Sequence, residues 1–138
     1  MEELEDKLAK FFGRKERVKV AYLFGSAAKG EVGELSDVDV AVYLDDSLTD
    51  EERFKLRLEL MSELASLFGT DKMDLVVMND NPLLLNYNVI KHGKLVKSDE
   101  RTRVRMETKI LSRYLDMKHY IDRHTRLSIE RMAEKGLS

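Results

Sequence analysis

One short segment of this sequence combines a glycine–serine turn with two closely spaced carboxylates. Gly25 and Ser26 follow a run of β-forming residues, and Asp37 and Asp39 begin the next such run. A turn of small residues after a strand lets backbone N–H groups approach a phosphate. Two carboxylates at alternate strand positions point the same way and repel each other unless a cation lies near. Because Mg²⁺ prefers carboxylate and phosphate oxygens, the segment could hold a nucleoside triphosphate and its magnesium ions.

A third acid, Asp74, lies in the otherwise apolar run 72–78. A buried carboxylate is costly unless it is paired or metal-bound, so we expect its strand to lie beside the strand of Asp37 and Asp39. Three clustered carboxylates could hold two metal ions about 4 Å apart, which would clamp an attacking and a leaving oxygen. The alternative is that Asp74 is an ordinary acid at the solvent-exposed start of a strand.

Two further residues of the segment could assist phosphate binding. Lys29 could place a positive charge on a triphosphate, as a point charge and not as a fork. Ser36 could donate a hydrogen bond to a terminal phosphate, or it could cap the turn before Asp37. A glycine–serine pair after a strand is common in turns, so only the combination with the acids is specific.

The composition sets the limits within which this site must be built. The chain has 138 residues, 43% hydrophobic and 36% charged, with a net charge of −2 and no cysteine. We therefore expect a single globular domain over residues 1–138, without disulfides or thiolate metal sites. No apolar run approaches the roughly 18–20 residues of a membrane span, and the lack of cysteine suits a reducing compartment, so we expect a cytoplasmic protein. The absence of a strong basic patch argues against direct nucleic-acid binding.

Hydrophobic periodicity and turn residues predict a small mixed sheet flanked by helices, an α/β (α+β) domain. Thr49 and Glu52 form a capping-box pattern, Gly69 ends the helix that follows, Pro82 suits the first turn of a short helix, and Ser98 could be the N-cap of a long one. The expected helices are 3–12, 50–68, 82–91 and 98–134, and the expected strands are 17–24, 37–44, 72–78 and 93–97.

The long final helix carries more apolar surface than contact with a small sheet requires. We expect this surface to serve a partner or a dimer, or the helix to wrap around the domain. Its apolar residues form two adjacent stripes: Met106, Ile110, Tyr114, Met117 and Ile121 in one, and Val104, Leu111 and Leu115 in the other.

The Gly25–Ser26 turn, the Ser36-Asp37-x-Asp39 motif and the later acid Asp74 together resemble the signature of the DNA polymerase β-like nucleotidyltransferase superfamily. The small size and the spacing Gly-Ser-x₁₀-Asp-x-Asp are most similar to the minimal nucleotidyltransferases. The resemblance spans residues 22–44 and is extended by Asp74. Members often have Arg where Lys29 stands, a mild departure.

The resemblance implies a polymerase β-like fold and a site that binds ATP and two Mg²⁺ ions. Its catalytic residues and metal ligands would be Asp37, Asp39 and Asp74. Its nucleotide-binding residues would be Gly25, Ser26, Lys29 and Ser36.

Minimal nucleotidyltransferases commonly pair with a HEPN-domain ribonuclease as a toxin–antitoxin system. The resemblance therefore implies transfer of AMP from ATP to a tyrosine hydroxyl of a HEPN toxin, in a hetero-oligomer in which this chain is the antitoxin. One alternative is an antitoxin that neutralises its partner by contact without catalysis. Another is a nucleotidyltransferase acting on a small molecule of the aminoglycoside type.

Overall fold

The computed structural model describes residues 2–25, 38–70 and 72–134. It contains the helices and the mixed sheet that the sequence predicts. Most helix and strand ends differ from their predicted positions by one or two residues. In chain order the elements are α1 (Glu2–Gly13), β1 (Val18–Phe24), β2 (Val38–Leu44), α2 (Asp50–Phe68), β3 (Met73–Val77), a 3₁₀ turn η1 (Met78–Asp80), α3 (Leu83–His92), β4 (Lys94–Ser98) and α4 (Glu100–Glu134).

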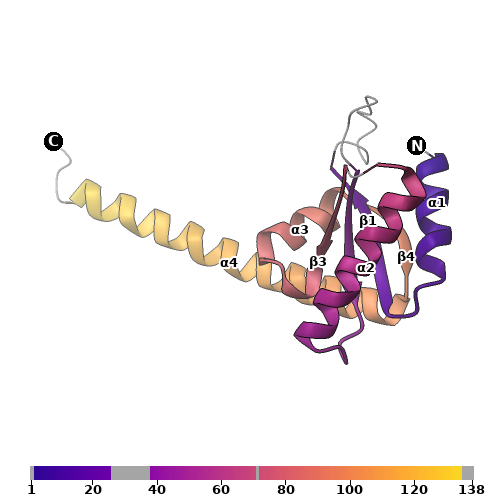
Figure 1. Ribbon diagram of the computed structural model, residues 1–138. Helices are drawn as coiled ribbons and strands as arrows, with labels where there is room; N and C mark the ends of the chain where they lie inside the picture. Colours follow the sequence, from indigo (N-terminus) through magenta and orange to yellow (C-terminus); the bar gives the residue numbers. More distant parts are fainter. Residues whose placement is uncertain (1, 26–37, 71, 135–138) are drawn as a thin grey trace.

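The four strands form one sheet in the order β3-β2-β1-β4 (Figure 1). β1 is antiparallel to both β2 and β4, whereas β2 and β3 are parallel. Parallel neighbours need a crossover connection, and α2 supplies it. The sheet is therefore mixed, and the strand of Asp74 lies directly beside the strand of Asp39, as expected from the sequence.

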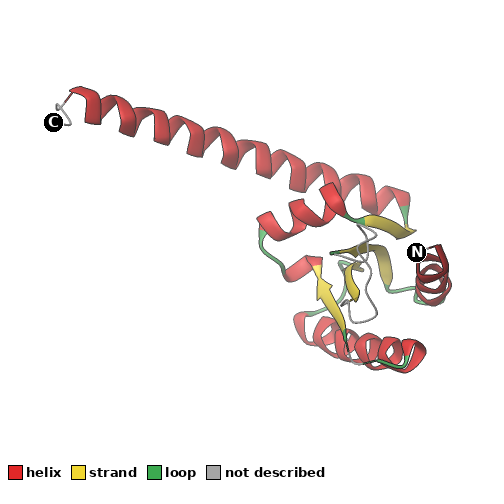
Figure 2. Ribbon diagram, turned by 90° about the horizontal axis from the view of Figure 1, so that it is seen from above, coloured by secondary structure: helices red, strands yellow, loops and turns green. Residues whose placement is uncertain are grey.

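Helices cover both faces of the sheet (Figure 2). Because side chains alternate along a strand, β2 sends Val40 and Val42 into the core beneath α1 and α2, and Ala41 into the core beneath α3 and α4. Leu8 and Leu60 complete the first core from α1 and α2. The second core is formed by Val20, Tyr22, Ala41, Met78, Val89, Met106 and Ile110.

Most of the expected helix ends are confirmed. The Thr49 side chain accepts from the backbone N–H of Glu52, and the Glu52 side chain accepts from the N–H of Thr49. Gly69 ends α2 in the left-handed conformation, with φ of +64°.

The expectation that Ser98 caps the last helix is wrong. Ser98 is the last residue of β4 and pairs with Val20 of β1, so its backbone belongs to the sheet. α4 begins at Glu100, and the Asp99 side chain accepts a hydrogen bond from the Thr102 hydroxyl at 2.6 Å.

The long helix α4 does not wrap around the domain. Its first turns lie against the sheet, where Thr102, Met106 and Ile110 are buried. From Lys118 to Glu134 every residue is exposed, and this half of the helix projects away from the body (Figures 1 and 2). With 35 residues α4 is about 50 Å long, longer than the sheet can cover. The expectation that this helix wraps around the domain is therefore wrong, and the expectation that its apolar residues serve a partner or a dimer stays a prediction.

None of the helices in the described part of the chain combines the length and the apolar character needed to cross a membrane.

Candidate active site

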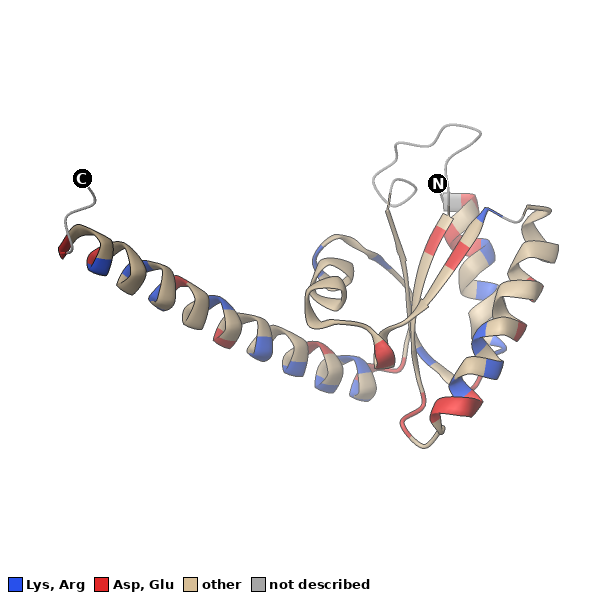
Figure 3. Cartoon of the chain, turned by 60° about the vertical axis from the view of Figure 1, so that its left-hand side comes forward, with Lys and Arg blue, Asp and Glu red and all other residues tan. Residues whose placement is uncertain are grey.

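Asp39 and Asp74 lie side by side on neighbouring parallel strands. They are direct register partners in the β2–β3 ladder, at the start of both strands. Adjacent strands are about 4.8 Å apart, and directly opposed residues share a face. Both side chains point to the face covered by α3 and α4, because their neighbours Val40 and Leu75 point into the core on the other face. Figure 3 shows the acidic positions of β2 and β3 next to each other at this end of the sheet.

The turn after β1 is built against Asp39. Gly25 has φ of +79°, a conformation that residues with a side chain rarely adopt. A Cβ atom at Gly25 would overlap Oδ2 of Asp39 and lie only 3.2 Å from its Cγ. Phe24, which precedes the turn, is the register partner of Asp39 in the β1–β2 ladder. Glycine is therefore required at position 25 both by its dihedral angle and by the closeness of the carboxylate.

Four of the residues that the sequence assigns to the site lie outside the described residues. These are Ser26, Lys29, Ser36 and Asp37, which all fall in 26–37. Their roles in nucleotide and metal binding stay predictions. The structure describes the other three assigned residues, Gly25, Asp39 and Asp74. They lie at the ends of three different strands and meet at one end of the sheet.

Asp74 is not buried, contrary to what its apolar neighbours in the sequence suggest, although its expected place beside Asp39 is confirmed. Asp74 is exposed, because β3 is an edge strand and Asp74 is its second residue. Asp39 is half-buried on the inner strand β2. Its two chain neighbours, Met73 and Leu75, point into the opposite core, so they do not surround the carboxylate. An exposed carboxylate at this edge is accessible to an incoming molecule.

The donor set fits a hard divalent cation. Two carboxylates on one face repel each other, and a cation between them removes the repulsion. Mg²⁺ is usually held by one or two carboxylates, with phosphate oxygens and water completing its octahedral shell. Within the described ranges no group of three or more His, Cys, Asp or Glu could enclose a metal ion. Asp39 and Asp74 could supply carboxylate oxygens to such an ion, and phosphate oxygens and water would complete its shell.

Tyr22 fixes α4 to the sheet on the face where the carboxylates lie. Its hydroxyl donates to Oε2 of Glu107 at 2.5 Å, and Arg103 donates to Oε1 of the same carboxylate at 2.9 Å. Burial, together with the Glu107 carboxylate, raises the pKa of Tyr22 well above its usual value. The sequence alone does not reveal this contact. A tyrosine inside an apolar strand was the available signal, but its partner is 85 residues away.

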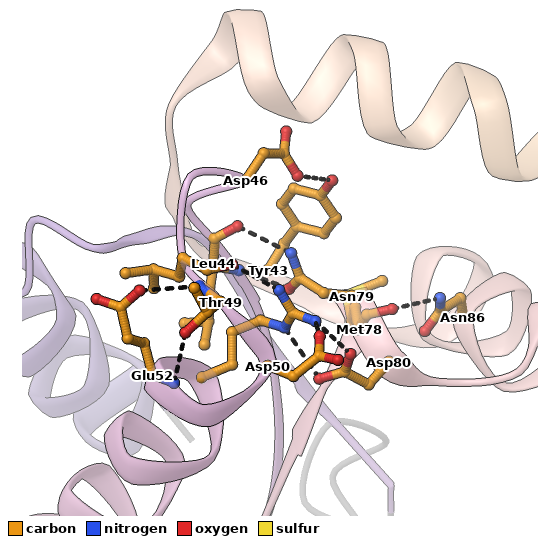
Figure 4. A network of polar contacts seen from close by, with 12 residues as sticks. Tyr43, Leu44, Asp46, Thr49, Asp50, Glu52, Met78, Asn79, Asp80 and Asn86 are labelled. Atoms are coloured by element: carbon orange, nitrogen blue, oxygen red, sulfur yellow. Dashed lines mark hydrogen bonds and ion pairs between the residues drawn. The ribbon is translucent and has the colours of Figure 1, made fainter.

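A second polar network closes the opposite end of β2 and β3 (Figure 4). The Asn79 amide accepts from the backbone N–H of Leu44 at 2.8 Å and donates to the Leu44 carbonyl at 3.0 Å. Arg53 of α2 donates to both carboxylate oxygens of Asp80 and to the Leu48 carbonyl. These contacts attach the end of β3 to β2 and to α2, and so help to fix the register that brings Asp39 and Asp74 together.

Comparison with known proteins places this arrangement in a family. The family model described as "Polymerase beta, Nucleotidyltransferase" matches residues 6–102, which include Gly25, Asp39 and Asp74. The protein adenylyltransferase MntA of Shewanella oneidensis is 31% identical over 98 residues, which are 71% of this chain and 67% of the relative.

Solved structures share the fold over nearly the whole chain. A chain of a toxin–antitoxin crystal structure with AMP-PNP is 25% identical, with a TM-score of 0.65, covering 97% of this chain and 98% of the other. A re-refined complex of the tri-AMPylated Shewanella oneidensis HEPN toxin with an MNT antitoxin contains a chain that aligns over all of both chains, with a TM-score of 0.61 at 24% identity. At that identity the second likeness shows the fold alone.

The matched region contains all the strands and the paired carboxylates, and the chain belongs to the polymerase β-type nucleotidyltransferase family.

Proposed function

We propose that this chain is a magnesium-dependent adenylyltransferase that transfers AMP from ATP to a tyrosine hydroxyl of a HEPN ribonuclease and so acts as its antitoxin. The observation that carries the proposal is the pairing of Asp39 with Asp74, with the Gly25 turn closed against Asp39. The relative MntA is itself named a protein adenylyltransferase.

The donor half of the reaction follows from the chain's own residues. Gly25 would let backbone approach the triphosphate at the end of β1, and Asp39 and Asp74 would be the carboxylates that hold a cation there, with Asp37 as a further ligand. When bound, Mg²⁺ neutralises phosphate charge and makes the α-phosphorus more open to attack. Two ions are the number that the three carboxylates would support.

In the reaction the acceptor hydroxyl oxygen forms a bond to the α-phosphorus of ATP. The bond from that phosphorus to the oxygen bridging the α- and β-phosphates breaks, and pyrophosphate leaves. The hydroxyl proton must be removed, and Asp74, exposed on the edge strand, would help by metal coordination or as the base. Phosphoryl transfer of this kind depends mainly on alignment and charge stabilisation, which fixed carboxylates on a rigid sheet can provide.

A protein acceptor suits the shape of the chain. The candidate site lies at an open edge of a small sheet, and the described residues include no second lobe that would enclose a small acceptor. The projecting half of α4 exposes apolar residues that a protein partner could cover. The solved toxin–antitoxin complexes with this fold supply the class of partner to test, a HEPN toxin.

The test is to incubate the purified chain with its candidate HEPN partner, Mg²⁺ and ATP labelled at the α-phosphate. We expect label on the partner, a mass increase equal to one or more AMP groups, and a modified tyrosine in the peptide map. Asp39→Asn and Asp74→Asn should each reduce labelling by at least about 100-fold, as expected for groups that align the reacting atoms. Asp6→Asn, at an exposed position of α1 on the other face of the sheet, makes the same charge change away from the site and should label normally.

An unmodified partner would refute the proposal, and so would full activity of Asp39→Asn. Label on residues other than tyrosine would leave adenylyl transfer standing and overturn the acceptor. The exposed apolar residues of α4 favour one second candidate, neutralisation by contact alone. If Asp39→Asn neutralises the toxin in cells as well as the wild-type chain does, contact and not transfer is the function.

A further inference from the structure

A cavity of about 300 Å³ lies at the end of the sheet opposite to Asp39 and Asp74. It opens between the carboxyl ends of β2 and β3, the start of α3 and the first half of α4. Four strand positions, or roughly 13 Å, separate Asp39 from Tyr43 at its wall. The polar and charged residues that line the cavity besides Tyr43 are Asp46, Arg53, Asn79, Asn81, Asn86, Lys109 and Arg113.

Two amide side chains of this cavity have polar atoms without a protein partner. Nδ2 of Asn81 and Oδ1 of Asn86 are both buried and make no hydrogen bond to the described part of the protein. Asn86 is only 7% exposed, and its other amide atom donates to the Met78 carbonyl at 2.9 Å (Figure 4). The third amide, Asn79, is by contrast fully used by Leu44. Buried polar groups are normally satisfied, and both residues line the cavity, so an occupant toward which these two amides turned would gain one donor and one acceptor.

Some charged residues of the cavity wall are paired with other side chains, and those not paired within the described part of the chain are positive. Asp46 accepts from the Tyr43 hydroxyl at 2.6 Å and from Arg105 at 2.9 Å. Arg53 is paired with Asp80.

Lys109 and Arg113 have no ion-pair partner among the residues that the structure places. They are four positions apart on α4 and therefore lie on the same side of the helix, beside the cavity.

We propose that this cavity binds a small molecule that carries an oxyanion, a phosphate or a carboxylate, next to a hydrogen-bond donor. The oxyanion would lie against Lys109 and Arg113 and would accept from the Asn81 amide. The donor would reach the acceptor oxygen of Asn86. A cavity of this size holds a metabolite but not a folded chain. Such a ligand would connect α4 to the ends of β2 and β3.

The test is a titration of the ¹⁵N-labelled chain, free of divalent metal, followed by ¹H–¹⁵N NMR. Inorganic phosphate is the probe in one arm and malate, which carries a hydroxyl beside a carboxylate, in the other, so that the two sources of the oxyanion are distinguished. The stronger probe should shift the amide signals of residues 79–86 and 106–113 in a saturable manner. The double variant Lys109→Gln, Arg113→Gln should weaken that binding at least tenfold, and Asn86→Leu should weaken it without any change of charge.

The control pair, Lys118→Gln and Arg123→Gln, removes the same charge from exposed positions farther along α4 and should leave binding within twofold of wild type. Asp39→Asn should also leave it unchanged, because the candidate active site lies at the other end of the sheet. The proposal is overturned if neither probe binds at tens of millimolar, if the control pair weakens binding as much as the cavity pair, or if Asp39→Asn abolishes it.

Discussion

Replacing Gly25 by alanine tests the link between the turn after β1 and the carboxylate of Asp39. Two separate costs are expected. An L-residue at the left-handed φ of +79° costs about 1–2 kcal/mol. The new Cβ would also overlap Oδ2 of Asp39, and moving that side chain out of its rotamer costs about 0.5–1.5 kcal/mol more. The free energy of unfolding should therefore fall by about 1.5–3.5 kcal/mol for Gly25→Ala.

Two other glycines of the chain separate these costs. Gly69 also has a positive φ, +64°, but a Cβ there would meet nothing within 4 Å, so Gly69→Ala should show the dihedral cost alone. Gly13 ends α1 without a positive φ and with open space around it, and Gly13→Ala should be neutral or stabilising by about 0.4–1 kcal/mol. Urea unfolding followed by circular dichroism measures all three variants.

The activity of the same variants tests the site itself. A displacement of Asp39 by about 1 Å should lower adenylyl transfer about 100-fold in Gly25→Ala, because alignment of the reacting atoms is lost. Gly69→Ala should transfer AMP at the wild-type rate under conditions in which it stays folded. If Gly25→Ala and Gly69→Ala lose the same stability and both remain fully active, the turn does not position the Asp39 carboxylate and our reasoning about this contact is wrong.

Three further perturbations test the elements around the site. Burial and Glu107 raise the pKa of Tyr22, so the stability that this side chain contributes is complete below pH 10 and is lost as the pH rises above that value. Tyr22→Phe should therefore flatten the alkaline loss of stability in pH-dependent urea unfolding, whereas Tyr120→Phe, at an exposed position, should not. Thr49→Ala removes the capping box and should cost about 1 kcal/mol of unfolding free energy, against no measurable cost for Thr125→Ala on the exposed helix; equal costs would contradict the assigned cap. Ile121→Lys should leave the stability of the isolated chain within about 0.5 kcal/mol of wild type, because Ile121 is 50% exposed. The same variant should weaken binding to the protein partner at least tenfold by calorimetry, and unchanged binding would exclude this part of α4 from the interface.

Local patterns were sufficient to predict most of the elements. The capping box at Thr49 and the glycine stop at Gly69 depend on residues close together in the chain, and the structure confirms both of them. Ser98 was assigned wrongly because a serine before a helical pattern has the same local appearance whether it caps a helix or ends a strand. The pairing of β4 with β1, a distant contact, decided between the two.

For the candidate site, the residue types and their spacing follow from the sequence alone: a glycine at a strand end, and acids suited to hard cations and phosphate. The tertiary structure decided which of these groups meet. The parallel pairing of β2 with β3, which depends on the α2 crossover, places Asp74 opposite Asp39, and Gly25 at the end of β1 lies against the same carboxylate. The tertiary arrangement also leaves Asp74 exposed and lets α4 project beyond the domain. The burial of a side chain depends on how much sheet is present to cover it, and no local pattern contains that information.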